Sequence, residues 1–126
     1  MPQTLTYNVW MYRDPTLATS LNKQRIVGYD VESIDGSIGK IDDASFETDS
    51  GHIVVDTGPW IFGKKVMLPV GVLRNVDHEN EKVFVNRTKD EIKSSPEFDD
   101  TLIHDESYRT KLGSYYGPEG KGYRDF

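Results

Sequence analysis

The segment from Ile53 to Asp77 constrains the fold of this 126-residue chain most strongly. It reads IVVDTGPWIFGKKVMLPVGVLRNVD, in which short runs of β-branched and aliphatic residues alternate with glycine and proline. Such runs predict short strands, and a Gly-Pro pair predicts a turn because proline cannot donate a hydrogen bond to a strand ladder. The segment therefore predicts short strands joined by tight connections, a pattern typical of a small β-barrel.

The same pattern continues on both sides of this segment. Asp35-Gly36 is expected to form a tight turn, because glycine tolerates a positive φ. The apolar residues after the turn are spaced irregularly, which indicates a β-bulge at Gly39 or at Asp42-Asp43. Further breaks are expected at Gly58, Pro59 and Pro69. Roughly six short strands result, at about residues 26–31, 38–46, 52–57, 66–69, 72–76 and 82–86.

Two helices are expected after the strands. Thr88-Lys89-Asp90-Glu91 has the spacing of a capping box, which predicts a short helix that ends before Pro96. Asp105 can cap a second helix, closed by Gly117. The chain is thus divided into an N-terminal arm that wraps loosely (1–25), a barrel domain (26–96) and a C-terminal helical extension with a mobile tail (97–126).

The composition restricts the class of partner. A formal net charge of -6 and a pI near 5.0 argue against direct contact with nucleic acid, which needs clustered lysine and arginine, but leave basic proteins as partners. The chain has no cysteine, which fits a reducing compartment. No signal-peptide pattern or apolar run long enough for a transmembrane segment is present. We therefore expect a cytoplasmic protein.

No motif for catalysis or cofactor binding stands out. Residues 58–64 fit G-x-x-x-x-G-K. In a phosphate-binding loop the eighth residue carries a hydroxyl and a helix begins there, but here the eighth residue is Lys65 and a strand is expected to follow. The histidines do not have the spacing of metal ligands on a helix; they are His52, His78 and His104. We expect no catalytic residue, cofactor, metal ion or small-molecule substrate.

Several blocks of sequence resemble the PRC-barrel family. They are Asp35–Ile41 (DGSIGKI), Val54–Val66 (VVDTGPWIFGKKV) and Leu68-Pro69. The resemblance covers about residues 26–96, and the later TKDEIK, SPEFD and LGSYYG segments resemble the C-terminal extension of a bacterial stand-alone subgroup. It implies a six-stranded β-barrel that works as an adaptor, as in the photosynthetic reaction-centre H subunit and a ribosome-maturation factor. It implies no shared catalytic residues.

Aromatic residues are the best candidates for an interaction surface. One group can plug a barrel end or face a partner: Trp60, Ile61 and Phe62. The other group lies at i, i+7 and i+8 of the last expected helix and can pack on the barrel or dock onto a second protomer: Tyr108, Tyr115 and Tyr116.

These features predict a non-enzymatic interaction module that forms a homodimer or a larger homo-oligomer. The main alternative is an adaptor that binds a basic protein during ribosome or membrane-complex assembly. A more distant alternative is a small hydrolase that uses paired aspartates, namely Asp42-Asp43 and Asp99-Asp100.

Overall fold

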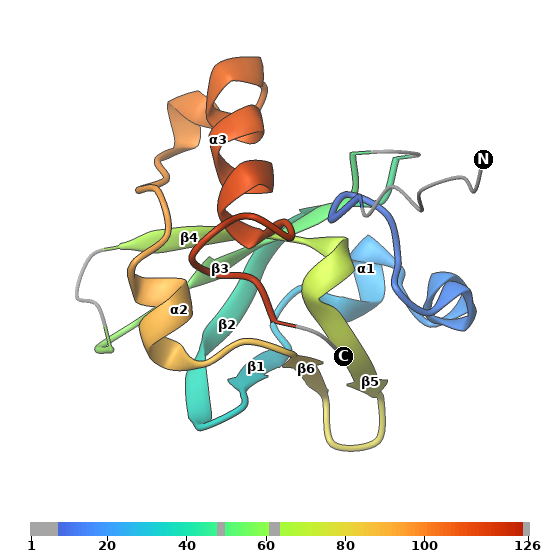
Figure 1. Cartoon of the computed structure of the whole chain (residues 1–126). Coiled ribbons are helices and arrows are strands. Elements are labelled where there is room, and N and C mark those ends of the chain that lie inside the picture. The colour runs from blue at the N-terminus through green and yellow to red at the C-terminus, as the bar shows by residue number, and fades with distance from the viewer. Residues whose placement is uncertain (1–7, 48–49, 61–63, 125–126) are drawn as a thin grey trace.

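The computed structural model describes residues 8–47, 50–60 and 64–124, and within these ranges a six-stranded sheet curls around an apolar core (Figure 1). The strand order is β4-β3-β2-β1-β6-β5, and neighbours are antiparallel except for the parallel pair β1 and β6. The strands are β1 (Asp30–Ser33), β2 (Gly36–Ser45), β3 (His52–Asp56), β4 (Lys65–Pro69), β5 (Leu73–Asp77) and β6 (Lys82–Val85). The predicted six-stranded fold is confirmed, in an open form.

The longest strand, β2, contains both of the predicted irregularities. Its register against β1 shifts at Ile38, next to Gly39, and its register against β3 shifts at Asp42. A bulge bends the strand that carries it and increases its twist. Two bulges in one strand allow β2 to pair with both neighbours while the sheet curls.

Helical segments flank the sheet. They are η1 (Pro15–Thr19), α1 (Lys23–Ile26), η2 (Val70–Val72), α2 (Lys89–Lys93), η3 (Asp100–Leu102) and α3 (Glu106–Tyr116). The predicted capping box of α2 is confirmed, since the Glu91 amide donates to the Thr88 hydroxyl and the Thr88 amide donates to the Glu91 carboxylate. The predicted cap of α3 is also confirmed, because the Tyr108 amide donates to Asp105.

The first strand begins later than expected. Residues 23–26 form α1, and its amino end is capped by the Asn22 side chain, which accepts a hydrogen bond from the Gln24 amide. Ile26 is fully buried, and it belongs to this helix rather than to a strand. The prediction of a strand over 26–31 was therefore wrong in its first half. The Asn22 cap, which the prediction did not include, favours a helical turn here.

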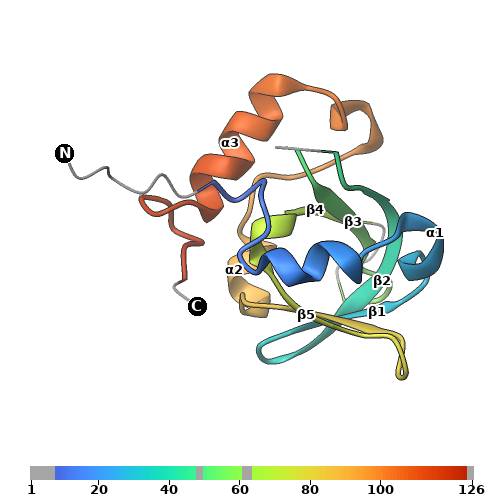
Figure 2. The same ribbon diagram turned by 90° about the vertical axis from the view of Figure 1, so that its right-hand side faces the viewer.

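The N-terminal arm is packed into the core from Val9 onward. Val9, Leu17 and Leu21 are buried, and the Gly71 amide donates to the Val9 carbonyl over 2.6 Å. In Figure 2 the arm runs from the foot of α3 across the front of the barrel to α1. The expected loose wrap is thus a docked segment, because its isolated apolar residues enter the same core cluster as the strands.

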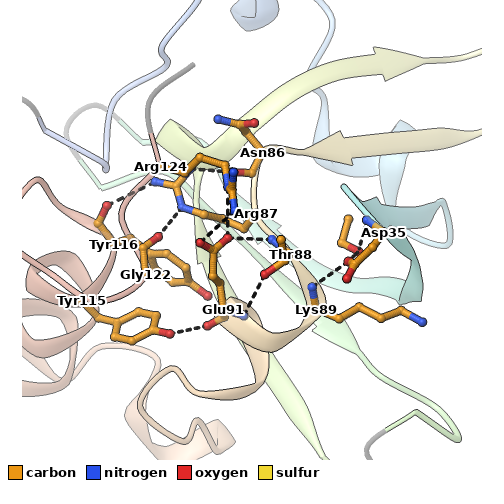
Figure 3. A network of polar contacts seen from close by, with 11 residues as sticks. Asp35, Asn86, Arg87, Thr88, Lys89, Glu91, Tyr115, Tyr116, Gly122 and Arg124 are labelled. Carbon is orange, nitrogen blue, oxygen red and sulfur yellow. Dashed lines mark hydrogen bonds and ion pairs between the residues drawn. The ribbon is translucent and has the colours of Figure 1, made fainter.

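The end of the chain, expected to be mobile, folds back on α3 as far as Arg124. The Gly122 amide donates to the Tyr115 carbonyl. The fully buried guanidinium of Arg87 donates to the carbonyls of Asn86, Tyr116 and Gly122, over 2.7, 3.2 and 2.6 Å (Figure 3). A single side chain after β6 therefore anchors both the end of α3 and the segment that follows it.

Candidate interaction surface

Trp60 lies in the connection between β3 and β4, and the backbone around it is well constrained. Gly58 has a φ of +55°, and Pro59 follows it. The Trp60 amide donates to the Thr57 carbonyl over 3.1 Å, while the Thr57 hydroxyl donates to the Lys64 carbonyl over 2.8 Å. The predicted turn at Gly58 and Pro59 is confirmed. It holds the indole at the edge of the core, half-buried.

A groove of about 520 Å³ opens beside Trp60. Buried residues of the sheet form its floor, including Ile38 and Thr57. Pro59 and Trp60 supply an apolar wall, and charged side chains stand at the rim, namely Asp30, Lys40 and Asp56. An apolar centre with a charged rim is the usual composition of a protein-protein contact.

The charges at the rim are held by short contacts. Lys40 Nζ lies 2.8 Å from a carboxylate oxygen of Asp30. Asp56 is exposed and accepts a hydrogen bond from the Gly58 amide over 2.9 Å. The groove therefore carries one internal ion pair and a second carboxylate that is fixed by the turn.

A cation reaches the Trp60 ring from α2. Lys89 Nζ lies 6.0 Å from the centroid of the indole, at the outer limit of a cation–π contact. The Lys89 amide donates to Asp35 over 2.8 Å, as Figure 3 shows, and this hydrogen bond lowers the pKa of the Asp35 carboxyl. The predicted turn at Asp35-Gly36 is confirmed, with a φ of +137° at Gly36. Three segments distant in sequence thus meet around Trp60.

Two of the three residues in the predicted Trp60 group, Ile61 and Phe62, lie outside the described residues. Their place in an interaction surface stays a prediction. Pro69, expected to break the chain, is the last residue of β4, and the 3₁₀ turn η2 begins directly after it. Lys65 opens β4, so the G-x-x-x-x-G-K pattern runs into a strand rather than into the helix that a phosphate-binding loop requires.

The tyrosines of α3 do not form a common surface. Tyr108 is 6% exposed and Tyr116 is fully buried, so both rings belong to the core. The buried stripe of α3 is Tyr108, Leu112 and Tyr116, at i, i+4 and i+8. The sequence allowed these tyrosines either to pack on the barrel or to dock onto a second protomer, and Tyr108 and Tyr116 pack on the barrel. Their assignment to an exposed contact surface is therefore corrected here.

Tyr115 differs from its neighbours because it is only partly buried. Its hydroxyl donates to the Glu91 carbonyl over 2.5 Å, and its ring packs edge-on against Tyr116 with centroids 4.9 Å apart. Burial raises the pKa of the Tyr115 hydroxyl, and the Glu91 carboxylate raises it further. Tyr115 thus joins α3 to α2 while keeping part of its ring accessible.

The two buried tyrosines should respond differently to loss of the hydroxyl. The Tyr116 hydroxyl makes no hydrogen bond of good geometry among the described residues, although the Ser95 side chain interacts with it, whereas the Tyr108 hydroxyl donates to the Pro96 carbonyl over 3.1 Å. Tyr116→Phe should leave the free energy of unfolding unchanged or raise it, and the matched control Tyr108→Phe should lower it by about 1 kcal/mol. Urea denaturation of both variants measures the difference, and a larger loss for Tyr116→Phe would contradict this assignment.

The remaining candidates for chemistry are the histidines and the two pairs of aspartates. Within the described ranges no three His, Asp or Glu side chains come together as a possible metal site. Asp43 pairs with Lys23 at 3.0 Å, while Asp42 and Asp100 both pair with Lys65, at 3.0 and 3.5 Å. Asp99 caps η3 by accepting from the Thr101 amide. The aspartates proposed for a hydrolase therefore each make a structural contact.

The comparison with known families agrees with this architecture. The sequence profile of the PRC-barrel domain matches residues 20–92, which is more than half of the chain. The chain belongs to the PRC-barrel family. This confirms the resemblance carried by the DGSIGKI and VVDTGPW blocks, and it assigns the curled sheet around Trp60 to the PRC barrel itself.

Part of the chain also aligns with a solved structure. The match is to a protein described as a putative 16S ribosomal RNA processing protein, RimM, from Pseudomonas aeruginosa, at 17% identity and a TM-score of 0.48. The alignment covers 56% of this chain and 46% of that protein, so the chain matches about half of its length. No curated protein matches this chain. None of the helices in the described part of the PRC-barrel protein is long and apolar enough to cross a membrane.

Proposed function

We propose that this PRC-barrel protein is a non-enzymatic interaction module, and that the groove beside Trp60 is its contact surface. The observation that carries the proposal is a half-buried tryptophan held over a groove by a hydrogen-bonded Gly-Pro turn. Tryptophan is enriched at the energetic centre of protein interfaces. A side chain whose backbone is already ordered also loses less conformational entropy on binding.

The charges around the groove favour a second copy of the chain as the partner. A two-fold contact brings the same patch of both protomers together, so that patch must be complementary to itself. The carboxylate of Asp56 stands at one side of Trp60, and the ammonium of Lys89 stands over its ring. Both signs of charge are therefore present, and Asp56 of one protomer can pair with Lys89 of its partner.

Replacing Trp60 should have a small effect on the stability of the fold and a larger effect on self-association. Because the indole is half-buried, Trp60→Ala should lower the free energy of unfolding by about 1–2 kcal/mol, less than the roughly 3–5 kcal/mol expected for a fully buried ring. If Trp60 is an interface anchor, the same change should weaken self-association by about 30-fold, which corresponds to roughly 2 kcal/mol. Urea denaturation and sedimentation velocity over a concentration series measure the two effects.

A charge exchange provides the matched control. Asp56→Lys and Lys89→Asp should each weaken association, because each places like charges in contact across the two-fold axis. The double variant should restore it. A wild-type protein that stays monomeric at high micromolar concentration would refute self-association, and failure of the double variant to restore it would remove this groove from the interface.

A basic protein is the second candidate partner, favoured by 21 acidic against 15 basic residues in the chain. Complementary charge speeds encounter and makes binding sensitive to salt. In this case the wild-type protein should capture a basic protein at low salt and release it at high salt. Trp60→Ala should reduce that capture even if the free protein is a monomer.

A further inference from the structure

A polar contact joins β3 to α3 inside the protein. His52, the first residue of β3, is only 2% exposed. The terminal nitrogen Nη2 of Arg109, on α3, lies 3.0 Å from His52 Nδ1 and 3.3 Å from the Ser50 carbonyl oxygen. The guanidinium group of Arg109 therefore contacts both the His52 ring and the Ser50 carbonyl.

This geometry determines which form of His52 fits the site. A guanidinium has hydrogen-bond donors only and keeps its proton at accessible pH. The Ser50 carbonyl, 3.3 Å from Nδ1, is an acceptor and suits a protonated Nδ1, but the closer contact, with Arg109 Nη2 at 3.0 Å, requires Nδ1 to accept and so places the ring proton on Nε2. The Arg109 Nη2 group has two hydrogens, so it can donate one to His52 and one to Ser50. Both contacts are satisfied together only while His52 is neutral.

The same guanidinium also holds the N-terminal arm. Arg109 Cζ lies 4.7 Å from the ring centroid of Trp10, well within the range of a cation–π contact. One helical turn further along α3, Gly113 leaves room for the indole, since an added Cβ would lie 2.8 Å from Trp10 Nε1. The Trp10 carbonyl accepts from the Gly51 amide. Residues of β3, α3 and the arm are thus connected through one arginine.

The surrounding charges oppose a positive charge on His52. Burial is the largest influence on the pKa of His52 and lowers it; the Ser50 carbonyl, 3.3 Å from Nδ1, raises it, and the charges of Arg109 and His104 lower it. Asp43 on β2 acts in the opposite direction, but it is already ion-paired with Lys23 at 3.0 Å. Burial lowers the pKa of Arg109, and the nearby carboxylate of Glu47 acts against this and favours the charged form. The neutral ring is therefore the stable form near neutral pH.

We propose that His52 is an acid-operated latch that holds Arg109 of α3 in place against Trp10 of the N-terminal arm. When Nδ1 takes a proton from solvent, it becomes a donor and faces the donors and positive charge of Arg109. The guanidinium must leave, and Trp10 loses its cation–π partner. A groove of about 690 Å³ already lies between Asn8–Trp10 and α3, whereas buried Val9, whose carbonyl accepts from the Gly71 amide, keeps the rest of the arm on the barrel. Acid then opens this face while the six-stranded sheet remains.

Linkage gives the direction of the effect. Because the pKa of His52 is lowered in the folded state, the unfolded chain binds more protons below the ordinary histidine value of about 6.5. The contribution of the neutral His52 to stability is complete above that pH. It falls as the pH decreases toward the folded-state pKa, and release of Trp10 should begin in this window.

Tryptophan fluorescence provides a direct test. The chain has two tryptophans, so Trp60→Phe leaves Trp10 as the only emitter. On titration from pH 8 to acid, we expect Trp10 to become solvent-exposed in one step below the ordinary histidine pKa, while hydrogen exchange still protects Val83 in β6. His52→Gln, which can accept from Arg109 but cannot titrate, should abolish the step. The controls His78→Gln and His104→Gln should retain it.

Three results would overturn the latch. These are a step that persists in His52→Gln, loss of Val83 protection at the same pH as the Trp10 change, or no Trp10 change before the whole protein unfolds. If His52→Gln does not fold, NMR of the unsubstituted protein replaces it. The His52 ring nitrogens should then show the Nε2–H form, with a titration that coincides with the change at the Trp10 indole. An Nδ1–H form at neutral pH would refute the proposal.

Discussion

Gly39→Ala is expected to lower the free energy of unfolding by about 2–6 kcal/mol, combining the cost of an unfavourable φ with that of overpacking. Gly39 has a φ of +144°, and a Cβ at this position would overlap the Asp56 carbonyl oxygen and approach Thr57 Cα to 2.9 Å. Those neighbours are backbone atoms of β3 and the residue after it. They cannot move aside without separating β2 from β3 at the bulge.

Gly58→Ala is the matched control for this experiment. Gly58 also has a positive φ, +55°, but an added Cβ there would meet no atom within 4 Å. Its replacement should cost only the conformational term, about 1–2 kcal/mol. Urea denaturation of both variants isolates the cost of the close approach. Equal losses at Gly39 and Gly58 would show that β2 and β3 are not in contact as described.

Arg87→Met is expected to lower the free energy of unfolding by about 2–4 kcal/mol. Methionine can fill much of the buried space, but it leaves the carbonyls of Asn86, Tyr116 and Gly122 without the donors that Arg87 supplies. An unsatisfied buried carbonyl costs about 1–3 kcal/mol. Loss of the buried positive charge offsets part of this penalty, because the guanidinium no longer has to be desolvated.

The loss at Arg87 should be concentrated at the end of the chain. Two of its three acceptors belong to α3 and to the segment after it, so hydrogen exchange should accelerate at the Gly122 amide more than at amides of β2. Arg124→Met is the control: its ion pair with Glu91, at 3.3 Å, is partly exposed and should contribute less than about 1 kcal/mol. Uniformly faster exchange across the barrel would contradict an anchoring role for Arg87.

Local sequence signals were sufficient for most of the sheet and for the caps of two helices. Six strands follow from β-branched runs between turn residues, and the irregular spacing after Gly36 indicated a bulge at Gly39 or at Asp42-Asp43, where the structure has one at each place. Thr88 and Asp105 indicated the starts of α2 and α3 because a cap acts over only three residues. These features depend on neighbours in sequence, and a single chain is enough to recognise them.

The candidate surface was predicted only in part. Trp60 was singled out as a large aromatic residue beside a turn, but the groove and the approach of Lys89 depend on segments about thirty residues apart. Tyr108 and Tyr116 carried the same aromatic signal and are buried. An aromatic side chain favours the core and an interface for the same physical reason, since both remove apolar area from water.

Read alone, the amino-acid order is enough to predict a small six-stranded barrel with capped helices after it, because strand runs, turns and caps each depend on a few adjacent residues. The PRC family itself entered through the resemblance of the DGSIGKI and VVDTGPW blocks. Long-range packing settled the rest: which tyrosines are buried, how Arg87 anchors the glycine-rich end, and how Arg109 meets His52 and Trp10. The burial and partners of a polar side chain are set by residues that the folded chain brings together. No local pattern encodes that proximity.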